Sequence, residues 1–192
     1  MRRWARVRRS AAHALAGDAA AASVCEAVLV ADFMTRLPKA EIGAELLVAG
    51  YWPVGSELDC RPLLGRLVAS GWGCVLPVVT DTDSALLFRC WRPGERLVPG
   101  YFSIPEPVES ARTANPALVL VPLLAFDRAG HRLGQGAGFY DRTLASLRRV
   151  GSVLAVGLAF AAQEVAALPD EPHDQRLDWI VTENGAFPAQ TN

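Results

Sequence analysis

The residues best suited to bind an anion lie together in one stretch, Gly130 to Arg142. Its glycines at positions 134, 136 and 138 can adopt positive φ and let backbone N–H groups come close to a ligand. Arg132 can offer paired donors to phosphate oxygens, and Asp141 can either stabilise a helix dipole or help to hold Mg²⁺. The pattern predicts a phosphate-binding loop. The alternative is a glycine-rich hairpin followed by a helix that starts with an acid.

Two common nucleotide-binding motifs are excluded. The stretch has no Gly-Lys-Ser/Thr and is therefore not a Walker A loop. It is also not a dinucleotide fingerprint, because its third glycine comes one residue early and no Asp or Glu occurs between Arg142 and Gln163.

The elements around this stretch place it between a strand and a helix. An apolar run from Ala117 to Phe126, interrupted by Pro122, precedes it, and a predicted helix from Tyr140 to Arg149 follows. At such a junction, backbone N–H groups and the positive end of the helix dipole can hold an anion.

The rest of the chain alternates between strands and helices. An N-terminal helix is predicted to reach Phe33. A capping box at Ser56–Asp59 is predicted to open a second helix that ends near Ser70. Residues 92–116 are predicted to be mostly loop. The other predicted elements are strands at Glu45–Tyr51, Cys74–Val79, Ala85–Trp91, Ser152–Phe160 and Trp179–Thr182, and a short helix at Gln163–Leu168.

Because these strands are apolar runs, the sequence predicts one α/β domain over residues 1–192. We expect a three-layer sandwich, with a mostly parallel central sheet and helices on both faces. In such sheets ligands bind beyond the carboxyl ends of strands, a position that the turn after Tyr51 and the loop after Pro122 both occupy.

Composition narrows the functional classes. The net charge of −1 gives no reason to expect a nucleic-acid or membrane partner, and no apolar run is long enough to span a bilayer. The four cysteines contain no CxxC pair, which argues against a zinc site and favours a reducing cytoplasm. Five arginines among the first nine residues indicate a short surface helix whose arginines contact solvent or an anionic ligand; a mitochondrial transit peptide is the alternative.

The long glycine signature also resembles that of a known family. Val121–Asp127, Gly130, Arg132–Gly134 and Gly136–Arg142 resemble the signature of 5-formyltetrahydrofolate cyclo-ligases, also called methenyltetrahydrofolate synthetases. Other segments match the family in order, namely Tyr51-Trp52-Pro53 with Glu57-Leu58-Asp59, Ile104–Pro107, Gly157–Phe160 with Gln163, and His173-Asp174. The resemblance implies a Rossmann-like fold similar to the NagB/RpiA/CoA transferase-like architecture.

The resemblance also implies an activity. It is the ATP- and Mg²⁺-dependent cyclisation of 5-formyltetrahydrofolate to 5,10-methenyltetrahydrofolate, with phosphorylation of the formyl oxygen and release of ADP and phosphate. We accordingly expect a cytoplasmic, monomeric ligase whose cofactors are ATP and Mg²⁺ and whose partner is a small folate.

The roles implied by the resemblance fall on particular residues. The expected ATP-binding residues are Arg2, Arg6, Arg132, Leu133, Gly134, Gln135, Gly136, Ala137, Gly138, Phe139 and Tyr140. Arg132 and Asp141 are expected to be catalytic, and Asp141 and Asp174 to hold Mg²⁺. The expected substrate-binding residues are Tyr51, Trp52, Glu57, Gln135, Gly136, Ala137 and Gly138.

Some of these roles have alternatives. Asp174 can be a surface carboxylate beside His173, Glu57 a first-turn helix acid, and Tyr51 and Trp52 core residues.

The chain departs from the family pattern at the nucleotide side. The family usually carries a lysine near its N-terminus with an arginine four residues later; here Arg2 and Arg6 have that spacing, and another alignment puts Trp4 at the lysine position. Gln135 and Ala137 stand where some members have basic residues.

Two alternative functions remain open. One is a non-catalytic nucleotide- or RNA-binding module on the same fold, and the other is a different ATP-dependent enzyme that uses another acceptor.

Overall fold

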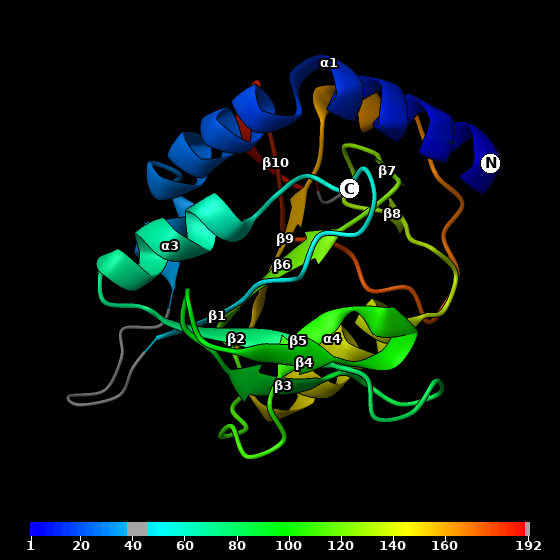
Figure 1. Cartoon of the computed structure of the whole chain (residues 1–192). Helices are drawn as coiled ribbons and strands as arrows, with labels where there is room; N and C mark the ends of the chain where they lie inside the picture. The colour runs from blue at the N-terminus through cyan, green and yellow to red at the C-terminus, as the bar shows by residue number, and fades with distance from the viewer. Residues whose placement is uncertain (38–45, 191–192) are drawn as a thin grey trace.

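A seven-stranded sheet forms the centre of the computed structural model, which describes residues 1–37 and 46–190 (Figure 1). Its strands, in spatial order, are β11 (Gly185–Pro188), β10 (Trp179–Thr182), β9 (Leu154–Leu158), β6 (Leu118–Pro122), β1 (Leu47–Ala49), β2 (Gly73–Val78) and β3 (Leu87–Cys90). The five inner strands are parallel to one another, and β3 and β11 pair antiparallel at the two edges. The predicted α/β class with a mostly parallel sheet is therefore confirmed.

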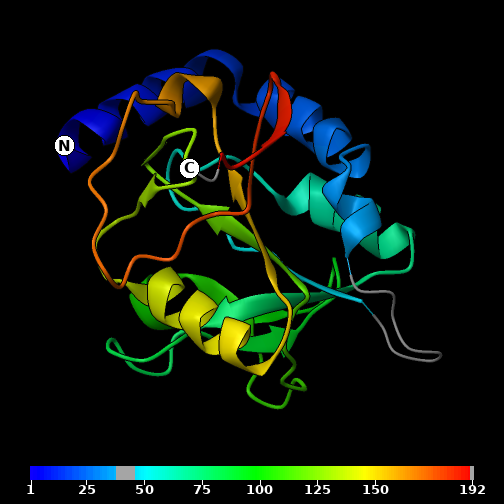
Figure 2. The ribbon, with the colours of Figure 1, turned by 180° about the vertical axis from the view of Figure 1, so that it is seen from behind.

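Helices cover both faces of this sheet. Helices α1 (Arg2–Leu29) and α3 (Arg61–Ala69) lie on one face, and α4 (Phe139–Val150) lies on the other, as the view from behind shows (Figure 2). In β6, Leu118 and Leu120 pack in the same core as Leu64 of α3, whereas Val119 packs in the core that contains Leu144 of α4. Burial on both faces explains why the strands are continuous apolar runs.

The order of the strands creates a crevice between β1 and β6. From β1 the chain passes through α3 to β2, and from β6 it passes through α4 to β9 on the other side. The two crossover helices cover opposite faces, so the chain segments after the neighbouring strands β1 and β6 diverge. Such a switch point is where ligands bind in open α/β sheets.

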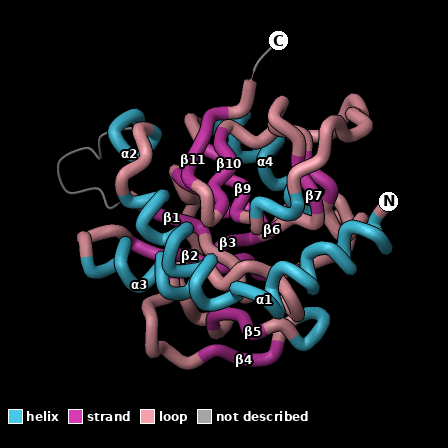
Figure 3. The backbone as a smooth tube through the Cα atoms, turned by 90° about the horizontal axis from the view of Figure 1, so that it is seen from above, coloured by secondary structure: helices cyan, strands magenta, loops and turns pink. Residues whose placement is uncertain are grey.

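Helix α1 is bent and connects two parts of the molecule (Figure 3). Alanine-rich sequence favours the helix, but Ala16, next to Gly17, has non-helical angles (φ −150°, ψ 21°). Residues after the bend, including Val24 and Val28, pack in the core with α3. Before the bend, Ala5 packs in a separate cluster with Leu124 and Ala125, which brings the start of α1 to the glycine-rich stretch.

Three predicted helices differ from the structure. The N-terminal helix, expected to reach Phe33, ends at Leu29. The helix expected from the Ser56–Asp59 capping box begins instead at Arg61, with Pro62 in its first turn, where proline is favoured. The helix expected at Gln163–Leu168 is absent from the described chain, where a short 3₁₀ helix, η2 (Ala161–Gln163), precedes an extended segment. That segment is held by the N–H of Val165, which donates to the Phe126 carbonyl at 2.9 Å.

Other elements differ in length or were not predicted. The Ala117–Phe126 run divides into β6 and β7 (Ala125–Phe126), and β7 forms a hairpin with β8 (Arg132–Leu133), so the glycines follow β8. Residues 92–116, expected to be mostly loop, contain the hairpin of β4 (Leu97–Pro99) and β5 (Pro105–Pro107) and the 3₁₀ turn η1 (Tyr101–Ser103). The edge strand β11 was not predicted. A short helix, α2 (Phe33–Arg36), follows α1, and Glu45, the predicted start of the first strand, lies outside the described residues.

No helix among residues 1–37 and 46–190 has the length and apolar character needed to cross a bilayer.

Candidate functional site

A cavity of about 640 Å³ opens at the carboxyl ends of β1 and β6. The expected site residues that line it are Arg2, Tyr51, Trp52, Glu57, Arg132, Leu133, Gly134, Gln135, Gly136, Ala137, Gly138, Phe139, Tyr140, Asp141 and Asp174. Arg6 does not line the cavity; its guanidinium donates to the Gln135 side chain instead, at 2.9 and 3.1 Å. Residues from both ends of the chain thus converge on one crevice.

The glycine loop is shaped by two left-handed residues. Gly136 (φ 110°) and Gly138 (φ 69°) adopt angles that disfavour other residues, whereas Gly134 does not. Gly138 caps α4, so Phe139 and Tyr140 bring the N-terminus of this helix to the cavity wall. From outside, Arg142 donates to the carbonyl of Ala137 at 2.9 Å and fixes the loop. The helix dipole and free N–H groups of this end favour a bound anion.

The start of α1 closes over the same loop. The Nε of Arg2 donates to the Gly134 carbonyl at 3.2 Å. Trp4 is half exposed, and the Arg8 guanidinium lies over its ring at 4.6 Å. Of the two residues that can align with the family lysine, it is therefore Arg2 that contacts the glycine loop.

Arg132 and Asp141 are joined through a third segment. Arg132, whose side chain is nearly buried, donates through Nη2 to Asp141 Oδ1 and through Nη1 to the Gln175 carbonyl. The N–H of Gln175 donates to the same Oδ1 at 3.0 Å. Asp141 Oδ2 accepts no hydrogen bond from the described residues and remains available to a ligand in the cavity.

Two carboxylates suit a nucleotide-bound magnesium ion. Among the described residues no group of three or more His, Cys, Asp or Glu side chains could hold a metal by itself. Asp141 and Asp174 both line the cavity; Asp174 Oδ2 accepts the Glu171 N–H at 3.1 Å, and its Oδ1 lies 3.9 Å from His173 Nε2. Mg²⁺ is typically held by one or two carboxylates, with substrate phosphates and water completing its shell, so this donor set fits.

Glu57 lines the cavity from the segment between β1 and α3. Its side chain is about 10% exposed; Oε2 accepts the Val54 N–H at 3.0 Å, and Oε1 pairs with Arg9 Nη1 at 3.3 Å. Burial raises the pKa of Glu57, and the Val54 N–H and the Arg9 charge partly oppose that rise. Because α3 begins only at Arg61, Glu57 is not a first-turn helix acid.

The aromatic residues beside Glu57 combine core packing with access to the cavity. Tyr51 is buried, its hydroxyl donates to the Leu58 carbonyl at 2.6 Å, and burial raises its pKa well above the usual value. Trp52 packs edge-on against Trp91, with ring centroids 6.1 Å apart. Both residues line the cavity, so the core interpretation and the ligand interpretation are compatible.

Sequence reasoning missed several lining residues. Arg9 is 5% exposed and faces the cavity. The sequence does indicate this position, because Arg2, Arg6 and Arg9 have the i, i+4, i+7 spacing of residues on one helix face. Tyr101 and Phe102 also line the cavity from the β4–β5 hairpin. Phe102 (φ 56°) is one of two non-glycine residues with positive φ in the described chain, and local sequence gave no sign of this backbone strain.

Comparison with known proteins identifies relatives over most of the chain. The sequence model of the 5-formyltetrahydrofolate cyclo-ligase family matches residues 21–183. The 5-formyltetrahydrofolate cyclo-ligase of Mycolicibacterium smegmatis is 38% identical over 143 residues, which cover 70% of this chain and 72% of that protein. The corresponding Escherichia coli protein is 37% identical over 140 residues, which cover 70% and 76%.

Solved structures agree with these relatives. The NMR structure of Aquifex aeolicus 5,10-methenyltetrahydrofolate synthetase has a TM-score of 0.70 and 25% identity, and the match covers 98% of this chain and 94% of that one. The Mycoplasma pneumoniae 5,10-methenyltetrahydrofolate synthetase shares the fold, with a TM-score of 0.64, 21% identity and coverage of 93% and 98%.

Proposed function

The chain belongs to the 5-formyltetrahydrofolate cyclo-ligase family and is an enzyme of that class. From this premise we propose that it uses MgATP to cyclise 5-formyltetrahydrofolate to 5,10-methenyltetrahydrofolate, by phosphorylation of the formyl oxygen. The observation that carries the proposal is the cavity at the sheet's switch point, where an anion-binding loop and a buried carboxylate beside aromatic rings face one space.

The glycine loop is the proposed triphosphate site. Backbone N–H groups of Gly134–Gly138 and the N-terminus of α4 are suited to phosphate oxygens. Arg2 and Arg132 supply positive charge to the cavity beside the loop, and Arg6 orients Gln135. Asp141 and Asp174 would hold Mg²⁺, which when bound neutralises phosphate charge.

The part of the cavity lined by Glu57 and Trp52 is the proposed folate site. The Glu57 carboxylate can accept paired N–H donors of a pterin ring, and Trp52 offers an aromatic face for stacking. With the pterin there, the formyl group would point along the cavity toward the glycine loop. The protein's main contribution is then to orient two substrates and exclude water.

The reaction proceeds in two displacements. The formyl oxygen attacks the γ-phosphorus as the bond to ADP breaks, which turns a poor leaving group into phosphate. N10 then attacks the formyl carbon, the carbon–oxygen bond breaks, phosphate departs and N10 loses its proton. Arg132 stabilises the charge that develops on the transferring phosphoryl group.

The direct test is to mix purified protein with 5-formyltetrahydrofolate and MgATP and follow the absorbance of methenyltetrahydrofolate. Product should form only when both ATP and Mg²⁺ are present, with one phosphate released per product. Product formation without ATP, or none from folded protein with all components, would contradict the proposal.

Three of the five N-terminal arginines do not support the RNA-binding alternative. Arg2, Arg6 and Arg9 are directed to groups of the same chain around the cavity and do not form an outward basic face. The remaining alternative is an ATP-dependent enzyme that uses a different acceptor. An assay with amide acceptors in place of the folate tests this alternative.

A further inference from the structure

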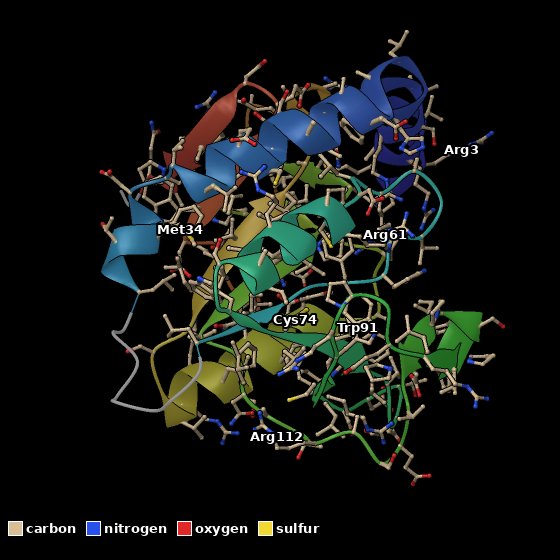
Figure 4. The ribbon with its side chains drawn as sticks, turned by 60° about the vertical axis from the view of Figure 1, so that its left-hand side comes forward. Arg3, Met34, Arg61, Cys74, Trp91 and Arg112 are labelled. Carbon is tan, nitrogen blue, oxygen red and sulfur yellow. The ribbon has the colours of Figure 1, made fainter. Side chains whose placement is uncertain are left out.

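Arg9 is a charged residue that folding has removed from water. Its residue exposure is 5%, yet it lines the cavity, in contrast to Arg3 on the same helix, which points away from the protein (Figure 4). Burial of a guanidinium carries a desolvation penalty that a hydrophobic residue would avoid. Such a residue therefore calls for an explanation in terms of what it contacts.

The guanidinium of Arg9 joins three separate segments. Its Nε donates to Ser56 Oγ at 3.2 Å, and its Nη1 donates to Glu57 Oε1 and to the Leu123 carbonyl, both at 3.3 Å. Ser56 and Glu57 precede α3, and Leu123 follows β6. Arg9 thus spans the crevice between the ends of β1 and β6.

We propose that Arg9 is a positioning residue for the folate, because it fixes the Glu57 carboxylate in the orientation that accepts the pterin donors. This proposal rests on the proposed function. It adds a residue of α1 to the proposed folate site, beyond the contacts of Arg2 and Arg6 at the glycine loop.

The geometry fits a guanidinium that both orients the Glu57 carboxylate and compensates its charge. The separation of 3.3 Å between Arg9 Nη1 and Glu57 Oε1 exceeds the ~2.7–2.9 Å of a tight charge-assisted bond. Arg9 Nη1 is shared with the Leu123 carbonyl, and Glu57 Oε2 is held by the Val54 N–H. The carboxylate is therefore held at both oxygens while it keeps acceptor capacity for a ligand.

Arg9 also supplies a positive charge that lowers the pKa of Glu57 against the larger effect of burial. Two other titratable groups of the described chain that interact with Glu57 are the hydroxyls of Tyr51, after β1, and Tyr140, in α4. Tyr51 is buried and Tyr140 is partly buried, and both have raised pKa values, so their hydroxyls stay neutral at physiological pH. Loss of Arg9 would leave Glu57 without its cationic neighbour.

The experiment compares Arg9→Gln, Arg9→Lys and the matched control Arg3→Gln, which removes an exposed arginine from the same helix. KM for 5-formyltetrahydrofolate, KM for MgATP and kcat are measured over a range of pH, with circular dichroism to check folding. We expect Arg9→Gln to raise the folate KM by about 10- to 100-fold, while the MgATP KM changes less than about twofold. Arg9→Lys should recover part of the loss, and Arg3→Gln should match the wild type.

The pH profile separates positioning from a merely structural role. Without Arg9 the pKa of Glu57 should rise further, so the folate defect of Arg9→Gln should shrink as pH increases and the carboxylate ionises. The double variant Arg9→Gln/Glu57→Gln should be no worse than Glu57→Gln alone. Parallel changes in both KM values, or a defect that pH does not alter, would overturn the proposal.

Two controls keep the outcome decisive. If Arg9→Gln does not fold, Arg9→Lys carries the test: a selective rise in folate KM supports the proposal, and an unchanged folate KM overturns it. If the wild type forms no product, the proposed function fails; calorimetric titration of the variants with 5-formyltetrahydrofolate then tests Arg9 separately, and equal folate affinity in wild type and Arg9→Gln overturns its role.

Discussion

Arg132 and Asp141 share one ion pair that ties the glycine loop to a distant segment, because each also bonds to the backbone of Gln175. The pair therefore has two functions in this fold. It holds residue 175, next to Asp174, against the start of α4, and it presents a guanidinium and a carboxylate oxygen to the cavity.

Substitution of Arg132 by alanine should damage both stability and activity. The change removes the guanidinium that donates to both the Asp141 carboxylate and the Gln175 carbonyl, which we expect to lower the free energy of unfolding by about 1–3 kcal/mol. Turnover should fall by at least ~10²-fold. Urea unfolding and the methenyltetrahydrofolate assay measure the two effects. An unchanged free energy of unfolding would mean that the contact between Arg132 and Gln175 does not stabilise the fold.

Substitution of Asp141 by asparagine should separate catalysis from folding. Asparagine keeps the shape and one acceptor oxygen, so the Gln175 N–H keeps a partner and the protein should remain folded. Loss of the negative charge should raise the Mg²⁺ concentration needed for half-maximal rate by roughly 10-fold or more and lower kcat. The exposed variant Glu26→Gln serves as a control. A normal Mg²⁺ titration with Asp141→Asn would exclude Asp141 as a ligand.

Folate affinity should depend on the ionisation of Glu57. Since burial raises the pKa of this carboxyl, it gains a proton at a higher pH than an ordinary glutamate does. The folate KM should therefore rise as pH falls into the mildly acidic range. In Glu57→Gln the KM should be high and should not change with pH in that range.

Acid unfolding is not the expected cause of the higher folate KM at low pH. A carboxyl with a raised pKa binds its proton more tightly in the folded state, so the contribution of Glu57 favours folding as pH falls through its folded pKa. Circular dichroism over the same range checks this. A KM that does not depend on pH in the wild type would argue against a Glu57 contact with the folate.

Two glycines of the loop should respond differently to alanine. Gly138 has φ +69°, and an added Cβ would meet Arg142 Nη1 at 2.7 Å, so Gly138→Ala should cost about 1–2 kcal/mol of stability. Gly134→Ala has no atom within 4 Å of the new Cβ and should fold normally. An increased KM for ATP with Gly134→Ala would support close approach of a phosphate. Equal destabilisation by both changes would contradict the described loop.

The four thiols should react at very different rates. Cys25, Cys60 and Cys74 are buried, and burial raises the pKa of each, that of Cys74 to about 12. Cys90 is partly exposed. A thiol reagent at neutral pH should label Cys90 first, with the others reacting only on unfolding. Rapid labelling of Cys60 in the native protein would contradict its burial.

Local sequence was sufficient for the α/β class, for the start of α4 and for the glycine loop. These features depend on short-range chemistry: apolar runs form doubly covered strands, and glycines provide the turn before the helix. The signature around Gly134–Gly138 and the segment at Tyr51–Glu57 also pointed to two halves of a site.

Tertiary structure alone decided how those halves meet. The strand order places β1 beside β6, although 68 residues separate Ala49 from Leu118. Local periodicity carries no information about such pairing, because strand order is determined by which cores the whole chain can bury. For the same reason the sequence could not show that Arg9 faces Glu57, or that Arg132 and Asp141 both bond to Gln175.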